Sequence, residues 1–162
     1  MKQIVIGILA VLALYGCNGN AQQINNKKMS KLIYVMDPLC GWCYGNSANT
    51  QHLYDTYKNQ IDFEILPAGM WIGKNARKQS KPMAQYIKKH DLQIQQVTGT
   101  AFGQDYFKFV ENESIVLDSE IPSRAIVTVK KIWATQAVSF AIEVQKARYL
   151  HAKDLNDDAT YL

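Results

Sequence analysis

Histidine is scarce in this sequence, and a basic stripe is lacking. The three histidines, His52, His90 and His151, are widely separated and show no paired spacing. A structural zinc site needs several such ligands brought together, so we expect no metal. The chain has 18 lysines and arginines against 14 acidic residues, a formal charge of +4, and its lysines are scattered among glutamines and acids. This distribution disfavours nucleic acid as a partner.

The start of the chain lacks a hydrophobic run long enough to cross a membrane. The apolar run from Ile4 to Leu14 is too short for a membrane span, and it follows the short basic start Met1 to Gln3. This pattern predicts an export signal over residues 1–17. The run ends at Leu14-Tyr15-Gly16-Cys17, which resembles the bacterial lipobox, where the signal is cut before a cysteine that is lipidated on its sulfur.

The lipobox resemblance predicts Cys17 as a lipidation site and the protein as a membrane-anchored lipoprotein facing the periplasm. Tyr15 is bulkier than the small residue usual at its position. The alternative is an ordinary secretory signal cut near Ala21, which leaves a soluble periplasmic protein. In both cases Cys40 and Cys43 are the cysteines that remain, the even number expected of an exported protein with one thiol pair.

One globular domain follows the signal. The chain has 162 residues, of which 48% are hydrophobic and 20% charged, which suits a single domain with a sizeable core. Residues 18–30 are polar and non-periodic, so we expect a flexible tether there. The domain proper begins near Lys31.

The Cys40 and Cys43 pair stands between two predicted strands. It directly follows the apolar run 31–36, and residues 42–58 then carry apolar side chains at helical spacing. Residues 61–66 alternate like a second strand. Two parallel strands joined by a helix form the opening half of a thioredoxin-like fold, and we assign residues 31–68 to it.

The position of the pair predicts redox chemistry. Cys40, at the start of a helix, faces unpaired backbone N–H groups that favour the thiolate. Cys43, one turn inside the helix, would be the more buried partner that closes the disulfide and releases what Cys40 has captured. The alternatives for this cysteine pair are half of a zinc site and an inert structural disulfide. Asp37 is interpreted as a cap of the following turn, with proton acceptance beside the dithiol as its alternative.

After Leu66 the sequence predicts a loop and then only helices. Ser80 and Pro82 begin one helix, and a second polar helix ends at Thr98-Gly99. Ser119 with Pro122 begins a longer helix, and Thr135 is a candidate cap for the next.

Their apolar stripes are predicted to form core. Trp71 and Phe102 are expected to be buried aromatics, with the lining of a hydrophobic groove as the alternative. His52 is expected on a helix surface.

Three segments resemble the DsbA-like thioredoxin-fold oxidoreductases, specifically the FrnE-type branch, over roughly residues 31–162. They are Asp37-Pro38-Leu39-Cys40-Gly41-Trp42-Cys43, Thr98-Gly99-Thr100-Ala101-Phe102-Gly103 and Asp118-Ser119-Glu120-Ile121-Pro122-Ser123-Arg124-Ala125. The resemblance implies that residues 69–162 form an inserted helical domain.

The resemblance also implies a later strand preceded by a cis-proline, followed by a further strand and a helix. The four prolines are Pro38, Pro67, Pro82 and Pro122, and none precedes a late strand. In addition, the segment from Asn156 to Asp158 is suited to a helix start only four residues before the last residue. We therefore expect a chain that is truncated at its C-terminus.

The predicted fold class is α/β, an incomplete thioredoxin-like βαβ unit followed by an inserted all-helical domain. The predicted function is an exported thiol-disulfide oxidoreductase that acts on protein thiols and disulfides through Cys40 and Cys43. Pro38, Gly41 and Trp42 support the motif. No cofactor is implied, and the redox partner and the direction of electron flow are left open.

Two alternative functions belong to other classes of protein. One is a truncated, non-catalytic binding module or fragment, tethered to the membrane. The other is a relative of the kappa-class glutathione transferases and hydroxychromene-carboxylate isomerases, which bind glutathione and usually present serine where Cys40 stands.

Overall fold

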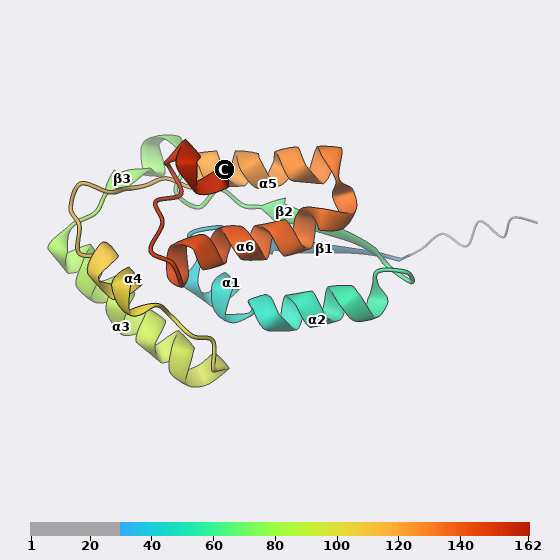
Figure 1. The fold of residues 1–162 in the computed structure, drawn as a ribbon, viewed down its shortest axis with the longest axis horizontal. Coiled ribbons are helices and arrows are strands. Elements are labelled where there is room, and N and C mark those ends of the chain that lie inside the picture. The colour runs from blue at the N-terminus through green and yellow to red at the C-terminus, as the bar shows by residue number, and fades with distance from the viewer. Residues whose placement is uncertain (1–29) are drawn as a thin grey trace, which may run out of the picture.

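The computed structural model describes residues 30–162 (Figure 1). The predicted export signal, Cys17 and all but the last residue of the predicted tether lie outside the described residues. In chain order the elements are β1 (Lys31–Met36), α1 (Gly41–Gly45), α2 (Ser47–Tyr57), β2 (Asp62–Pro67), η1 (Gly73–Asn75), β3 (Arg77–Lys78), α3 (Lys81–Thr98), α4 (Gln104–Phe109), β4 (Val116–Leu117), α5 (Glu120–Ile132), η2 (Ala134–Gln136), α6 (Ala137–Tyr149) and η3 (Asp158–Tyr161).

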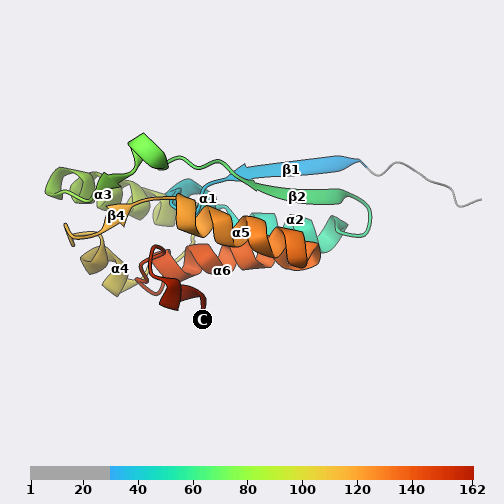
Figure 2. The ribbon, with the colours of Figure 1, turned by 90° about the horizontal axis from the view of Figure 1, so that it is seen from above.

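Strands β1 and β2 form the parallel pair that the sequence predicts, and helices α1 and α2 connect them. Helices α2, α5 and α6 lie on one side of this pair, and none of residues 30–162 covers its other face (Figure 2). Alternate residues of β1 show the same asymmetry, because Met36 is buried while Ile33 and Val35 are 52% and 56% exposed. The dithiol segment leaves the carboxyl end of β1.

The helix predicted over residues 42–58 is divided in two at Asn46. This residue has φ −88° and ψ −1°, outside the regular helical range. Its side chain donates to Thr50 Oγ1 (3.3 Å) and accepts from Asn49 Nδ2 (3.2 Å). Such local side-chain hydrogen bonds compete with the regular helix, and the dithiol therefore sits on a short helix of its own.

Two short strands after Leu66 contradict the prediction of an entirely helical remainder. Strands β3 and β4 pair antiparallel, with Arg77 opposite Leu117 and Lys78 opposite Val116. Each has two residues, too few for an alternating pattern to appear in the sequence. Their pairing is decided by tertiary structure.

Helix α3 is continuous, whereas the sequence suggested two helices over this range. Ser80 caps its start by accepting from the Met83 N–H (3.4 Å), and Pro82 lies in its first turn, as predicted. Gly99, with φ 74°, ends it at the predicted place. Asp91 lies in the polar middle of this helix and is buried, so the polar stretch is not a break.

Two side chains predicted to cap the following helices have other roles. Ser119 precedes α5, but its Oγ makes no cap and donates instead to the carboxylate of Asp37 (2.9 Å). Thr135 lies in η2, and its carbonyl accepts from the Tyr54 hydroxyl (2.7 Å). Near the last described residue, Asp157 does cap η3, within the segment predicted to start a helix.

The core of the described residues has three clusters, and helix α1 contacts one of the two larger ones through Cys43 and the other through Tyr44. We call the first the aliphatic cluster, and its buried members are Met36, Ile65, Ile126, Ala137, Ala141, Val144 and Leu155. We call the second the aromatic cluster, and its buried members are Tyr44, Ile94, Phe102, Tyr106, Val110 and Tyr149. Helix α6 contributes to both clusters, so most of its circumference is buried.

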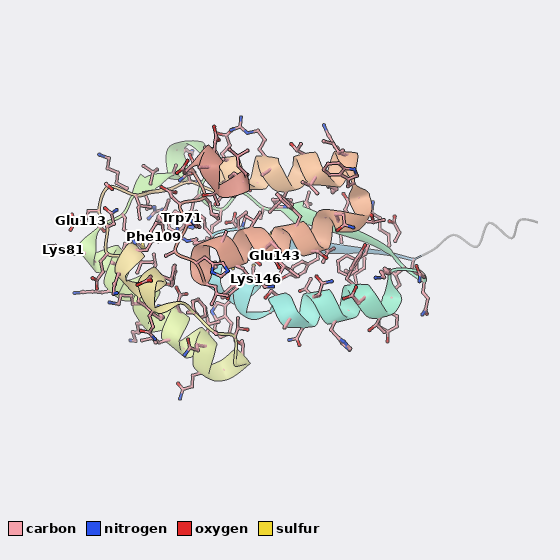
Figure 3. All side chains as sticks on the ribbon, viewed as in Figure 1. Trp71, Lys81, Phe109, Glu113, Glu143 and Lys146 are labelled. Carbon is pink, nitrogen blue, oxygen red and sulfur yellow. The ribbon has the colours of Figure 1, made fainter. Side chains whose placement is uncertain are left out.

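The helical part packs directly on the strands. The aliphatic cluster joins Met36 of β1 and Ile65 of β2 to side chains from α5 and α6. The exposed side of α6 carries an ion pair between Lys146 and Glu143 (2.7 Å) (Figure 3). The domain boundary between residues 68 and 69 stays a prediction, and core residues from both sides of it pack together. Within residues 30–162 no helix has the length and apolar character needed to cross a bilayer.

Candidate active site

Cys40 is the N-cap residue of α1. A turn that begins at Asp37, whose carbonyl accepts from the Cys40 N–H (3.1 Å), leads the chain from β1 into the helix. Cys40 has an extended backbone, and its Sγ accepts from the Cys43 N–H (3.3 Å). Both sulfurs are free thiols in this structure, and both residues are half-buried. The structure therefore places the Cys40 sulfur at the helix start, as the sequence predicts.

The two thiols have very different proton affinities. The hydrogen bond from the Cys43 thiol lowers the pKa of Cys40 from 9.0 to about 6, and backbone N–H groups of Cys43 and Trp42 act in the same direction against the effect of burial. The same thiol hydrogen bond, together with burial, raises the pKa of Cys43 well above its ordinary value. At neutral pH Cys40 is the thiolate and Cys43 the thiol.

The two cysteines also face different surroundings. Cys40 lines a cavity of about 430 Å³, whereas Cys43 packs against the aliphatic cluster. An incoming group can therefore approach Cys40 from the cavity. The Cys43 thiol is hydrogen-bonded to the Cys40 sulfur, so it is close enough to attack that sulfur.

Asp37 fixes the segment that precedes the dithiol. Its buried carboxylate accepts from the backbone N–H groups of Leu39 (2.8 Å) and Met70 (2.6 Å) and from the hydroxyl of Ser119 (2.9 Å). The bond to Leu39 is the turn cap that the sequence predicts. The other two were not predicted, since Ser119 lies 82 residues away and no local pattern links it to Asp37.

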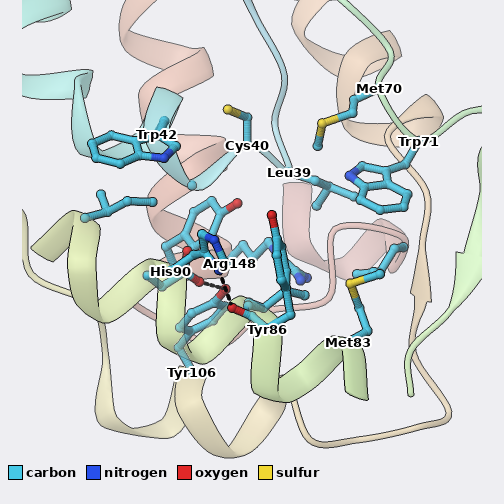
Figure 4. A pocket seen from close by; sticks show the side chains of 16 residues that line it. Leu39, Cys40, Trp42, Met70, Trp71, Met83, Tyr86, His90, Tyr106 and Arg148 are labelled. Carbon is cyan, nitrogen blue, oxygen red and sulfur yellow. Dashed lines mark hydrogen bonds between the residues drawn. The ribbon is translucent and has the colours of Figure 1, made fainter. Parts of the chain in front are cut away.

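Pro38, Gly41 and Trp42, predicted to support the motif, have three different environments. Pro38 is fully buried. A Cβ on Gly41 would lie 2.5 Å from Asp91 Oδ1 and 3.0 Å from Ile94 Cδ1, so glycine lets α3 approach the start of α1. Trp42 is 49% exposed and lines the cavity next to Cys40 (Figure 4).

The cavity has apolar walls and several polar groups. Its lining includes Leu39, Met70, Trp71, Met83, Ile87 and Leu117 among apolar residues. Trp71 is only partly buried and lines this cavity, so the alternative to a buried aromatic holds for it. The guanidinium of Arg77 stacks over its ring at 4.1 Å. Phe102, in contrast, is buried in the aromatic cluster.

Sequence reasoning missed four polar residues at the cavity, namely Asp91, Tyr106, Arg148 and Tyr149. The Tyr106 hydroxyl donates to Asp91 Oδ2 (2.6 Å) (Figure 4). Burial raises the pKa of Asp91 to about 6, although that hydrogen bond and the charge of Arg148 oppose the shift. These residues come from three helices, and no spacing in the sequence relates them.

The histidines do not gather in the structure. His52 is exposed on α2, as predicted, and His151 is exposed beyond α6. His90 lines the cavity. Over the described range, no three His, Cys, Asp or Glu side chains are grouped in a way that could hold a metal ion.

No protein-family model matches this chain, and no curated protein matches it in sequence. Solved structures do match. Cytosolic disulfide reductase DsbM from Pseudomonas aeruginosa is similar with a TM-score of 0.68 and 28% identity, over 80% of this chain and 59% of that chain. The same protein with GSH is similar with a TM-score of 0.67 and 28% identity, over 80% of this chain and 60% of that chain.

A putative protein disulfide isomerase from Nitrosomonas europaea is similar with a TM-score of 0.71 and 23% identity, over 82% of this chain and 61% of that chain. The chain thus spans about three fifths of the length of the solved structures it matches. These similarities, taken with the parallel pair and the helices after it, confirm the predicted fold class. The described residues have a DsbA-like thioredoxin fold, a βαβ unit followed mainly by helices.

Proposed function

We propose that this protein is a thiol-disulfide oxidoreductase that acts on protein thiols and disulfides through Cys40 and Cys43. The observation that carries the proposal is the Cys40 sulfur, which accepts the Cys43 N–H at the start of α1 and opens onto the cavity. The similar structures support the chemistry, because one is a disulfide reductase and another a putative protein disulfide isomerase.

The two cysteines would divide the reaction between them. The Cys40 thiolate attacks one sulfur of a substrate disulfide, the substrate S–S bond breaks, and the other half leaves as a thiolate. Cys43 then loses its proton and attacks the Cys40 sulfur, which closes the Cys40–Cys43 disulfide and releases the second substrate thiolate. Two electrons pass to the substrate, and the same steps in reverse oxidise a dithiol.

The environment of each thiol suits its step. A pKa of about 6 keeps Cys40 ionised at neutral pH, so it is the better nucleophile in the first attack and the better leaving group in the second. The raised pKa of Cys43 keeps it protonated until the mixed disulfide forms, since its largest cause is the hydrogen bond to the free Cys40 sulfur. Oxidation of Cys40 removes that partner.

The test is disulfide exchange by the full chain, with Cys40→Ser and Cys43→Ser as variants. Cys40→Ser should abolish exchange, and Cys43→Ser should accumulate a mixed disulfide on Cys40, detected by mass spectrometry. Exchange at the unaltered rate by Cys40→Ser would refute the proposal. A thiol-alkylation gel shift in glutathione redox buffers then gives the midpoint of the pair, and thereby the direction of electron flow.

Glutathione handling is a second candidate. The solved structure of DsbM with GSH favours it, and so does the cavity of about 430 Å³ beside Cys40, which can take a small molecule. Glutathione binding without any redox transition of the cysteine pair would favour this candidate over protein disulfide exchange. Cooperative unfolding together with turnover would argue against the third possibility, a non-catalytic binding module.

The cellular location is a separate proposal. We propose export and lipid anchoring at Cys17, on the pattern of residues 1–17, whereas the structurally similar DsbM is a cytosolic protein. Labelling with a radioactive fatty acid should mark the unaltered protein and not Cys17→Ala. Recovery of both proteins in the cytosol without label would refute this. The FrnE-type branch and the truncation of the chain stay predictions.

A further inference from the structure

Arg148 is a buried cation that forms no ion pair with any of residues 30–162. It lies on α6, is 3% exposed, and lines the cavity beside Cys40 (Figure 4). Three aromatic rings surround its guanidinium, with centroid distances of 5.8 Å to Tyr106, 5.4 Å to Phe109 and 5.8 Å to Tyr149. Its Nε is buried, and in the part of the chain that the structure describes it has no hydrogen-bond partner.

The rings do not satisfy this side chain. A guanidinium carries five N–H donors in its plane, and an aromatic ring attracts the cation without accepting those hydrogen bonds at full strength. Among residues 30–162, no carboxylate lies within 4.0 Å of the Arg148 nitrogens. Asp91 lines the same cavity, but its carboxylate accepts from the Tyr106 hydroxyl.

The tyrosines around the cavity do not neutralise the cation, and the nearby Asp91 carboxylate interacts with its charge without forming an ion pair with it. Burial raises the pKa of both Tyr106 and Tyr149 well above the ordinary value, so neither adds a negative charge. The planar fork of an arginine matches a carboxylate, which can accept two parallel N–H bonds. A phosphate dianion suits the site less well, because Asp91 already places one negative charge nearby. The apolar walls suit an organic group attached to the carboxylate.

We propose that Arg148 forms a carboxylate-binding subsite, which directs a carboxylate-bearing thiol or disulfide toward Cys40. This inference rests on the proposed function. In the exchange step the Cys40 thiolate forms a bond to one sulfur of the bound disulfide, and the other sulfur leaves as a thiolate with the electron pair of the broken bond. Arg148 holds the carboxylate, takes no part in bond making, and is a positioning residue.

The test compares two small aromatic disulfides on the reduced full chain. Dithiobis(nitrobenzoate) carries a carboxylate on each ring, and dithiodipyridine is uncharged, so the ratio of their rate constants cancels the intrinsic reactivity of Cys40. We expect Arg148→Met to lower this ratio about tenfold, the value of one charge-assisted hydrogen bond. Arg148→Lys keeps the charge without the planar fork and should give an intermediate ratio.

Arg124→Met is the matched control. Arg124 is an exposed arginine on α5, paired with Glu120 (3.6 Å), and its loss makes the same change in net charge. The ratio for Arg124→Met should equal that of the unaltered protein. An equal ratio for a folded Arg148→Met would overturn the proposal, because Arg148 would then be a purely structural cation.

A second measurement needs no variant. Benzoate should slow the reaction of the unaltered protein with dithiobis(nitrobenzoate), and the uncharged benzamide should not. Equal effects of benzoate and benzamide would overturn the subsite. If Cys40 reacts with neither disulfide faster than a free thiol does, the proposed function fails. In that case calorimetry of benzoate binding to the unaltered protein still tests the subsite: binding would support it, and no binding would overturn it.

Discussion

Helix α1 separates two kinds of interior. On the side of Cys43 the aliphatic cluster contains no charged group and joins the strands to α5 and α6. On the side of Cys40 the aromatic cluster lies beside two buried charged residues, Asp91 and Arg148. One short helix therefore places Cys43 against apolar packing and Cys40 at a cavity whose apolar walls also contain buried charged residues.

The comparison shows how one dithiol obtains two different thiols. The aliphatic cluster is stabilised by the burial of apolar area, so its side chains need to fit in shape and volume but need no polar partners. The aromatic side keeps charges inside the protein, where each needs a partner such as the Tyr106 hydroxyl or the face of a ring. The two sides of α1 should therefore respond differently to substitution.

The largest effect concerns the ionisation of Cys40. Thiolate absorbance of the reduced protein should titrate with a midpoint near pH 6, and Cys43→Ala should raise that midpoint, because the Cys43 thiol is the largest cause of the lowered pKa. Cys43→Ser keeps a hydrogen-bond donor and is the control. Its titration midpoint for Cys40 should be lower than that of Cys43→Ala. An unaltered midpoint in Cys43→Ala would contradict the assignment.

The same ionisation has a consequence for stability. Because the folded-state pKa of Cys40 is below the ordinary 9.0, the reduced protein gains stability as the pH rises from about 6 toward 9 and loses it as the pH falls through 6. Urea denaturation at several pH values should show this slope in the reduced protein. Cys40→Ser should lack this contribution.

A cavity in the aliphatic cluster should destabilise the fold strongly. Ile126→Ala removes a fully buried side chain on α5 and should cost about 3 kcal/mol of unfolding free energy. Ile132→Ala on the same helix is exposed and should cost no more than about 0.5 kcal/mol. Equal denaturation midpoints for the two variants would show that this cluster is not the main support of the strands.

Loss of the Asp37 carboxylate should have a somewhat smaller effect. Asp37→Ala leaves three donors without their acceptor, including the Met70 N–H and the Ser119 hydroxyl, and should cost about 2 kcal/mol. Exchange activity should fall as well, because the turn before Cys40 loses its anchor. The exposed Asp62→Ala is the control; a similar loss for it would count against a special role of Asp37.

Tyr106→Phe tests the polar side with a smaller change. It removes the hydroxyl that donates to Asp91 and should cost about 1 kcal/mol near pH 8. The cost should be lower near pH 5, because the pKa of Asp91 is about 6 and the protonated acid needs this donor less. The exposed Tyr86→Phe is the control. A cost independent of pH would contradict an ionised Asp91 at neutral pH.

The smallest effect is expected on the outer surface of the same helix as Tyr106. Lys108 and Asp105 form an ion pair (3.0 Å) on α4, with side chains 79% and 80% exposed. Lys108→Ala should change the unfolding free energy by no more than about 0.5 kcal/mol. A larger cost, measured by urea denaturation, would mean that surface charge and not the buried polar groups stabilises this region.

The sequence predicted the βαβ unit because its signals are local. The apolar run before Asp37, the short spacing of Cys40 and Cys43, and the alternation in residues 61–66 each lie within a few residues. The cap of α3 by Ser80 was equally readable. The division of the helix at Asn46 could not be predicted in this way, because an asparagine in a helical pattern does not indicate which neighbours its side chain will hydrogen-bond.

The candidate site was predicted only in part, for the same physical reason. The local pattern of residues 31–43 was enough to predict that Cys40 starts a helix after a strand and that Cys43 follows one turn later, because helix capping and dithiol spacing act over a few residues. Two features of the site depend on long-range packing: Ser119 donates to Asp37 across 82 residues, and Asp91 and Arg148 from separate helices line the cavity beside Cys40. Such buried polar groups are selected by partners that are distant in sequence, and no local pattern records them.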